Sequence, residues 1–146
     1  MDNSRGKILW VDDEIDHLKP HILFLEDKGF NISTASNGAD AVTLIKENNF
    51  QLILMDQFMP GQDGIQTIQE FSELRPNLPV IMITKSEEEW LMDEAISQKI
   101  SQFLIKPVSP SQIFMACKQV LENYKIREEK ITVSYTHLTL PTILLV

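Results

Sequence analysis

Four short apolar runs in this chain each end in a polar or charged residue. In chain order, they lead to the acid pair Asp12–Asp13, to Asp56, to Thr84 and to Lys106. Short runs that are apolar throughout are typical of parallel strands covered by helices on both faces. Because the carboxyl ends of such strands share one edge of the sheet, where ligands bind, we expect these five side chains to meet there.

Strand and helix patterns alternate along most of the chain, which indicates βαβ units and an α/β fold with a parallel sheet. The expected strands cover residues 7–11, 30–34, 51–55, 79–84 and 102–105. The expected helices lie near residues 14–28, 38–48, 64–74, 87–98 and 110–126. Gly29 is a good C-terminal stop for the first helix, and Ser109 with Gln112 predicts a capping box at the start of the last.

The chain has 146 residues, the size of one domain, and a net charge of −8 from 13 basic and 21 acidic side chains. So acidic a surface disfavours nonspecific binding to nucleic acid or to an anionic membrane. The sequence shows no signal-peptide pattern and no apolar run of membrane-spanning length. We therefore expect a cytoplasmic bacterial protein that contacts neither nucleic acid nor membrane through this domain.

Apart from the carboxylates, few residues of the chain could form a metal-binding site. Cys117 is the only cysteine, which excludes a disulfide framework and a zinc–cysteine cluster, and its apolar helical pattern indicates a core residue. His17 and His21 lie four residues apart, as a helical metal-binding pair would, but no further ligand accompanies them. We therefore do not expect a histidine-based metal site.

The three carboxylates at the expected sheet edge would repel one another, and a hard divalent cation removes that cost. Mg²⁺ prefers a few carboxylates together with water and phosphate oxygens. With a hydroxyl and an ammonium group nearby, this set indicates Mg²⁺-assisted phosphoryl transfer onto a carboxylate. The alternative for Asp12 or Asp13 is to cap the first helix, and both roles can coexist. Asp56 has little structural reason to end a buried strand, which favours a reactive role.

At these positions the sequence resembles the receiver domain of two-component response regulators, from Lys7 to Tyr124. The resemblance rests on an ordered set of motifs: Val11-Asp12-Asp13-Glu14, Met55-Asp56 with Met59-Pro60-Gly61 and Asp63-Gly64, then Thr84, Phe103 and Lys106-Pro107. It implies a flavodoxin-like doubly wound sheet of five parallel strands in the order 2-1-3-4-5, with five helices. Residues 8–16 and 84–89 also resemble a narrower group, the Bacteroidetes regulators that carry a receiver ahead of a PglZ-type domain and act in type IX secretion.

The resemblance implies a role for each residue of the acidic cluster. Asp56 is the phosphoacceptor, and it binds Mg²⁺ directly together with Asp13. The backbone carbonyl of Phe58 is the third protein ligand of the metal. Asp12 acts on the metal mainly through water.

Three further residues act on the phosphoryl group or respond to it in proteins of this kind. Lys106 pairs with the phosphoryl oxygens as a compact charge, and its bond to Pro107 often holds a cis peptide. Thr84 donates its hydroxyl to the phosphoryl group and moves inward, which leaves space for Phe103 to rotate. Because Phe103 lacks the hydroxyl of a tyrosine, this switch would rest on packing. The alternative is that Phe103 is a plain core aromatic.

These features predict a signalling switch rather than an enzyme: a domain that assists only its own phosphorylation and dephosphorylation. The expected partners are a histidine kinase or phosphotransfer protein, and an output domain or protein that binds the face formed by residues 87–98, 102–105 and 110–126. A homodimer is a further candidate. One alternative is a Mg²⁺-dependent phosphohydrolase with an aspartyl-phosphate intermediate, although Phe58 stands where such enzymes carry a general acid. The other is a receiver-like interaction module that works without phosphorylation.

The last residues of the chain do not continue the alternating pattern. We expect a receiver domain over residues 1–126 and the start of a linker to a missing output region over 127–133. Residues 134–146 resemble the translation of sequencing-adapter DNA, so we interpret them as a non-native tail. The alternative is a native extension with a strand-like pattern.

Overall fold

The computed structural model describes residues 5–57, 59, 61, 63–85 and 99–123, and its sheet has five parallel strands. The strands are β1 (Gly6–Val11), β2 (Phe30–Ala35), β3 (Leu52–Asp56), β4 (Val80–Thr84) and β5 (Gln102–Ile105). They lie in the order β2-β1-β3-β4-β5, and every neighbouring pair is parallel. The predicted doubly wound α/β sheet is therefore confirmed.

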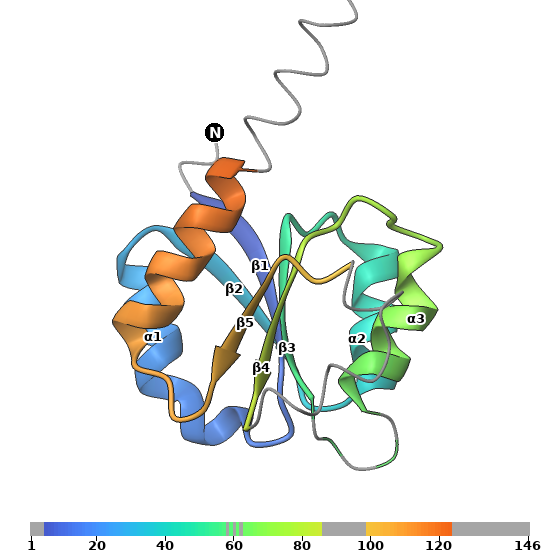
Figure 1. The fold of residues 1–146 in the computed structure, drawn as a ribbon, viewed down its shortest axis with the longest axis horizontal. Coiled ribbons are helices and arrows are strands. Elements are labelled where there is room, and N and C mark those ends of the chain that lie inside the picture. The colour runs from blue at the N-terminus through green and yellow to red at the C-terminus, as the bar shows by residue number, and fades with distance from the viewer. Residues whose placement is uncertain (1–4, 58, 60, 62, 86–98, 124–146) are drawn as a thin grey trace, which may run out of the picture.

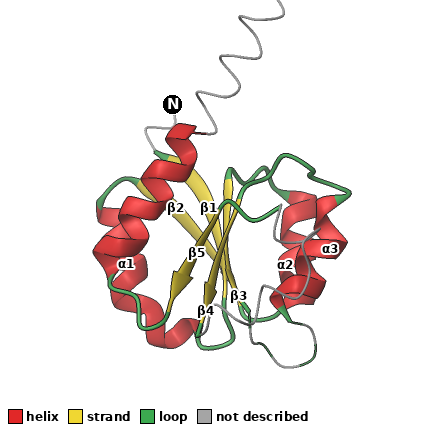
Figure 2. Cartoon of the chain, in the orientation of Figure 1, coloured by secondary structure: helices red, strands yellow, loops and turns green. Residues whose placement is uncertain are grey.

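Helices cover both faces of this sheet (Figures 1 and 2). On one side lie α1 (Lys19–Asp27) and a helix over residues 110–123, and on the other lie α2 (Gly38–Glu47) and α3 (Gly64–Ser72). The predicted helix over residues 87–98, the end of the last predicted helix and the whole predicted linker and tail lie outside the described residues. None of the described helices is long and apolar enough to cross a membrane.

The first helix begins later than its sequence pattern predicts. A short 3₁₀ turn, η1 (Ile15–Leu18), comes first, and the α-helix starts at Lys19 with Pro20 in its first turn. Proline has no backbone N–H and its ring clashes with the carbonyl four residues earlier, so a continuous α-helix through this position is unfavourable. At the first turn of a helix the same residue is well tolerated.

The predicted helix ends are largely as expected. Ser109 Oγ accepts from the Gln112 backbone N–H at 3.2 Å, and Gln112 Oε1 accepts from the Ser109 N–H at 2.9 Å, which completes the capping box. Gly29 follows α1 with φ at 103°, a left-handed conformation that favours glycine.

Two apolar layers hold the sheet between its helices, and successive strand residues alternate between them. The layer under α2 and α3 includes Ile53, Met55 and Met82, while the layer under α1 and helix 110–123 includes Leu54 and Ile83. All residues of β3 and β4 are buried, as predicted for strands covered on both faces. Trp10 and Cys117 belong to the second layer, and burial raises the pKa of the Cys117 thiol to about 12.

Candidate functional site

The carboxyl ends of the central strands bring the predicted residues to one edge of the sheet. Asp12 directly follows β1, Asp56 ends β3, Thr84 ends β4 and Lys106 directly follows β5. Asp12, Asp56 and Thr84 are buried, with 2%, 3% and 1% of each residue exposed. Polar groups at a strand end are rarely buried so completely without a purpose, because removing them from water is costly.

Lys106 joins two of the acidic residues. Its Nζ atom donates to Asp56 Oδ1 at 3.0 Å and lies 3.7 Å from Asp12 Oδ2. Its backbone N–H donates to the Thr84 carbonyl at 2.8 Å, which continues the pairing of β5 with β4. The peptide bond between Lys106 and Pro107 is cis, as the resemblance implied. The ammonium group is therefore held over the carboxylate that the sequence predicts to react.

The three acidic residues form a cluster that fits a small divalent cation. Asp12, Asp13 and Asp56 each offer one carboxylate oxygen, and these oxygens all lie within 4.8 Å of one another. Opposite oxygens of an octahedral Mg²⁺ site are about 4.2 Å apart, since each bond is about 2.1 Å long. Asp13 is exposed, so its side chain can close the small remaining gap. The predicted ligand Phe58 lies outside the described residues.

Burial makes this cluster electrostatically unfavourable without a cation. Loss of water raises the pKa of Asp12, and the neighbouring charges of Asp13 and Glu14 raise it further. A hydrogen bond from the Glu14 backbone N–H to Asp12 Oδ1, at 2.8 Å, and the charge of Lys106 oppose this shift only in part. That bond holds the backbone just before η1, so Asp12 has a structural role there, and its metal-binding role stays a prediction.

The surroundings of Lys106 favour its charged form, whereas those of Asp12 disfavour the charged form. Burial alone would lower the pKa of its ammonium group, but the hydrogen bond to Asp56 and the charges of Asp12 and Asp56 outweigh burial, and the pKa is raised. Lys106 therefore carries a full positive charge at neutral pH, which is the state needed to neutralise a phosphoryl group.

Thr84 and Phe103 lie on the same face of the sheet. Thr84 pairs with Ile105 across β4 and β5, and Phe103 lies two residues earlier on β5, where it pairs with Met82. Phe103 is half-buried and packs against the apolar layer under α2 and α3. Because diagonal neighbours on one face of a sheet are within reach of an aromatic ring, a movement of Thr84 can change the space open to Phe103.

Gly64 approaches the end of β3 closely, for a reason that the sequence motif alone does not show. A Cβ atom at Gly64 would lie 2.6 Å from the Asp56 carbonyl oxygen and 2.9 Å from Met55 Cγ. The Gly64 N–H also donates to the Gln57 carbonyl at 3.0 Å. The Asp63-Gly64 motif therefore reflects a close approach of the start of α3 to the backbone beside Asp56.

The two histidines of the first helical segment do not form a metal pair. His17 is exposed on η1, whereas His21 is half-buried on α1 and its Nε2 atom lies 2.8 Å from the Val108 carbonyl oxygen. The acidic cluster is the only candidate metal site of its kind among the described residues.

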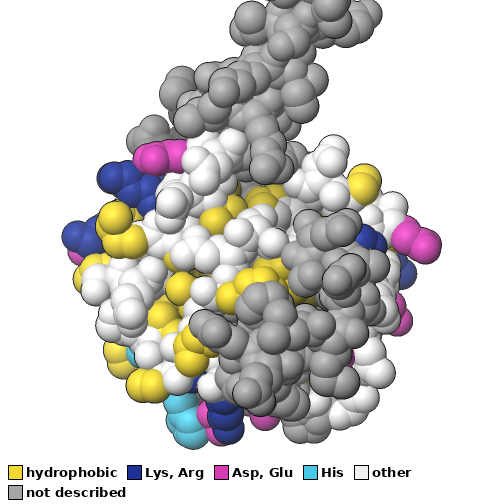
Figure 3. Space-filling model, in the orientation of Figure 1, with side chains coloured by type: hydrophobic (Ala, Val, Ile, Leu, Met, Phe, Trp, Pro, Cys, Tyr) yellow, Lys and Arg dark blue, Asp and Glu magenta, His cyan; other side chains and the backbone are white. Residues whose placement is uncertain are grey.

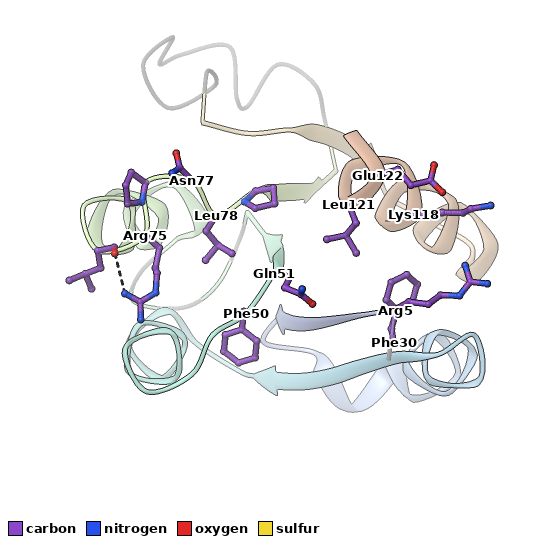
Figure 4. A pocket seen from close by; sticks show the side chains of 13 residues that line it. Arg5, Phe30, Phe50, Gln51, Arg75, Asn77, Leu78, Lys118, Leu121 and Glu122 are labelled. Atoms are coloured by element: carbon purple, nitrogen blue, oxygen red, sulfur yellow. Dashed lines mark hydrogen bonds between the residues drawn. The ribbon is translucent and has the colours of Figure 1, made fainter. Parts of the chain in front are cut away.

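A hollow lies at the opposite edge of the sheet. It has a volume of about 800 Å³ and lies between the α3–β4 loop and the end of helix 110–123 (Figure 4). Two of its three cationic residues contact other groups: Arg75 donates to the Leu74 and Ile45 carbonyls at 3.1 and 3.3 Å, and Arg5 lies over the Phe114 ring, while the third is Lys118. The hollow therefore offers no converging reactive groups comparable to those around Asp56.

Known proteins are similar to this chain in both sequence and fold. The family model of the response regulator receiver domain matches residues 8–118. The transcriptional regulatory protein SrrA of Staphylococcus aureus is 36% identical over 117 residues, which cover 80% of this chain and 48% of SrrA. The chain thus spans about half the length of the curated relatives that it matches.

Solved structures give the same result. The receiver domain of the Francisella response regulator 1452 has a TM-score of 0.72 at 26% identity, covering 82% of this chain and 98% of that one. NtrX from Brucella abortus has a TM-score of 0.79 at 27% identity, covering 88% of this chain and 29% of that one.

Proposed function

This chain belongs to the family of response regulator receiver domains of two-component systems, and on that basis we propose that Asp56 accepts a phosphoryl group from a partner histidine kinase or phosphotransfer protein. The observation that carries the proposal is the position of Lys106, whose Nζ atom lies 3.0 Å from Asp56 Oδ1 within a cluster of three carboxylates. An ammonium group and a cation site beside one buried carboxylate supply the charge neutralisation that phosphoryl transfer requires.

The proposed reaction moves one phosphoryl group between two side chains. An oxygen of the Asp56 carboxylate attacks the phosphorus of a phosphohistidine, the bond from phosphorus to the imidazole nitrogen breaks, and an acyl phosphate forms. The partner's imidazole leaves with the electron pair of that bond and takes up a proton. The domain contributes position and charge rather than a difficult chemical step.

The groups around Asp56 would stabilise the negative charge that the phosphoryl group brings to the site. Asp12, Asp13 and Asp56 would hold Mg²⁺, which when bound supplies positive charge to the phosphoryl oxygens. Lys106 can leave Asp56 and pair with a phosphoryl oxygen, because its long side chain starts from an anchored backbone position. The Thr84 hydroxyl, at the end of the neighbouring strand, would donate to a further oxygen.

We further propose that the signal leaves through the face formed by β5 and helix 110–123, together with the predicted helix over residues 87–98. Thr84 and Phe103 share one face of the sheet, which supports a packing change that starts at the phosphoryl group. Figure 3 shows apolar side chains at the surface on the β5 side of the molecule. Ile105, at the end of β5, and Met115, on helix 110–123, are 39% and 58% exposed. An output domain, another protein or a second copy of the chain in a homodimer would bind there.

On this proposal the chain acts in the cytoplasm, because histidine kinases of two-component systems present their phosphohistidine there. The narrower resemblance to the Bacteroidetes receiver–PglZ regulators stays a prediction, as does the non-native origin of residues 134–146.

The proposal is tested by incubating the chain with phosphoramidate and Mg²⁺ and weighing the intact protein. The wild type should gain one phosphoryl group, and Asp56→Asn, which keeps the size of the side chain but loses the nucleophilic oxygen, should gain none. Asp13→Asn serves as the matched control, because it should remain labelled at a reduced rate. Undiminished labelling of Asp56→Asn would contradict the assignment, and absence of labelling in the wild type would favour an interaction module that works without phosphate.

A further inference from the structure

His21 connects α1 to the turn that follows Lys106. Its Nε2 atom lies 2.8 Å from the Val108 carbonyl oxygen, although the two residues are 87 positions apart in the chain. A carbonyl oxygen only accepts hydrogen bonds, so Nε2 carries the hydrogen and donates it. Val108 stands two residues after Lys106, which places this bond next to the functional site.

The imidazole ring is confined on its other side by Trp10. The two rings meet edge to face, with centroids 6.2 Å apart and an angle of 85° between their planes. Trp10 is buried in β1, two residues before Asp12. His21 therefore lies between the strand that leads to the acidic pair and the turn that carries the lysine.

The bond to Val108 is the only hydrogen bond that this ring makes with the part of the chain that the structure describes. The second nitrogen, Nδ1, is buried and has no partner, and the Trp10 Nε1–H is likewise buried without one. An unpaired buried polar atom destabilises the fold, so an apolar side chain would fill this space more favourably if packing were the only requirement. The donor at Nε2 is what distinguishes histidine from such a residue here.

Two hydrogen bonds hold the backbone of the turn, and the Val108 side chain packs against the apolar layer under α1 and helix 110–123. The Lys106 N–H donates to the Thr84 carbonyl at 2.8 Å, and the Val108 carbonyl accepts from His21. Pro107 lies between these anchors and has no N–H with which to make a third. Because the lysine side chain is long and flexible, the place of its ammonium group depends on where this backbone segment is held.

We propose that His21 is a positioning residue for Lys106: by holding the Val108 carbonyl it keeps the Lys106 ammonium group against Asp56 and Asp12. The proposal deepens the proposed function, since it concerns a residue that acts on the same reaction through Lys106. His21 itself touches none of the reacting atoms.

Three substitutions in the full 146-residue chain separate the donor from the packing. His21→Gln keeps an N–H donor at a reach similar to that of Nε2, whereas His21→Leu fills the space without a donor. His21→Asn carries the same amide as glutamine on a shorter side chain that does not reach Val108, and it replaces the leucine variant if that variant does not fold. His17→Leu is the matched control, because His17 lies on the neighbouring turn and is exposed.

The first measurement needs neither metal nor phosphate. The side-chain ammonium signal of Lys106 is recorded by ¹H–¹⁵N NMR at low temperature and assigned by its loss in Lys106→Met. The signal should be sharp in the wild type, His17→Leu and His21→Gln, and broadened beyond detection in His21→Leu and His21→Asn. An unchanged signal in the last two variants, or loss of the signal in His21→Gln as well, would overturn the proposal.

The second measurement is the rate of labelling by phosphoramidate with saturating Mg²⁺. His21→Leu and His21→Asn should react about tenfold more slowly than the wild type, and His21→Gln should react at nearly the wild-type rate. Equal rates in all variants would overturn the positioning role. If the wild type itself is not labelled, the proposed function fails, and the ammonium signal alone decides whether His21 positions Lys106.

Discussion

The Nζ atom of Lys106 lies 3.0 Å from Oδ1 of Asp56, at the shared edge of a sheet whose strands bring together residues fifty positions apart. The contact joins a buried carboxylate to an ammonium group that is only partly shielded, with 27% of the lysine side chain exposed. The lysine is therefore close enough to neutralise Asp56 and accessible enough to follow a phosphoryl group.

Replacing Lys106 by methionine should lower the free energy of unfolding by about 1–3 kcal/mol in metal-free buffer, because Asp56 and Asp12 lose the cation that partly neutralises them in a buried site. Saturating Mg²⁺ should remove much of the difference, since the metal supplies the missing charge. Urea unfolding with and without Mg²⁺ measures both quantities. A metal-free methionine variant as stable as the wild type would show that the contact contributes nothing.

The raised pKa of Asp12 predicts a pH dependence of stability with a definite sign. The folded protein binds this proton more tightly than the unfolded chain, whose carboxyl group has the ordinary pKa of 3.8. The Asp12 contribution to the free energy of unfolding therefore falls as the pH rises from 3.8 through the raised folded-state pKa, and the full penalty is present above it.

Asp12→Asn should remove that penalty and still accept the hydrogen bond from the Glu14 N–H. Without divalent cations the variant should be more stable than the wild type at neutral pH, and the difference should shrink as the pH approaches 3.8. Added Mg²⁺ should stabilise the wild type more than the variant, because binding to the folded site alone raises stability by mass action. Thermal unfolding across pH gives the comparison, and a variant less stable than the wild type at neutral pH in metal-free buffer would refute it.

Alanine substitutions at two glycines distinguish the effect of a steric clash from that of backbone strain. Gly64→Ala should both destabilise the fold and slow labelling of Asp56, because its Cβ would lie 2.6 Å from the Asp56 carbonyl oxygen. Gly61→Ala should cost about 1–2 kcal/mol through its left-handed backbone alone, since φ is 83° and no described atom beyond the chain neighbours lies within 4 Å of the added carbon. Circular dichroism and labelling rates test the pair. Equal labelling rates in the two variants would mean that Gly64 does not support the phosphoacceptor.

Cys117 should be inert in the folded protein. It is fully buried and its pKa is raised to about 12, so the reactive thiolate is scarce and inaccessible at neutral pH. Reaction with a disulfide reagent should therefore require opening of the fold, and it should slow further when Mg²⁺ stabilises the folded state. Rapid stoichiometric labelling in native buffer, equal to that in urea, would contradict this placement of helix 110–123.

Much of this architecture could be predicted because each part leaves a local signal. The apolar runs indicated the strands, and the polar residue after each run indicated the edge where Asp56 and Lys106 meet. The start of α1 was placed too early, because the apolar period continues through η1 while Pro20 delays the α-helix. Ser109, Gln112 and Gly29 were correctly interpreted because capping depends on residues close in sequence.

Contacts between distant segments with no characteristic motif could not be predicted. His21 suggested only a weak metal pair with His17, whereas its partner is a backbone carbonyl on a turn after β5. A backbone acceptor has no sequence signature, so nothing in the chain pointed to it. The close approach of Gly64 to Asp56 was visible only as a motif, and its steric cause required the folded backbone.

The most direct test of the central claim is to locate the phosphoryl group chemically. After incubation with phosphoramidate and Mg²⁺, borohydride reduces an aspartyl phosphate to homoserine, and tandem mass spectrometry of the peptides identifies the residue that was converted. We predict homoserine at position 56 and unmodified aspartate at positions 12 and 13. Conversion of Asp12 or Asp13 in place of Asp56, or no conversion in protein shown to be folded and bound to Mg²⁺, would contradict the account.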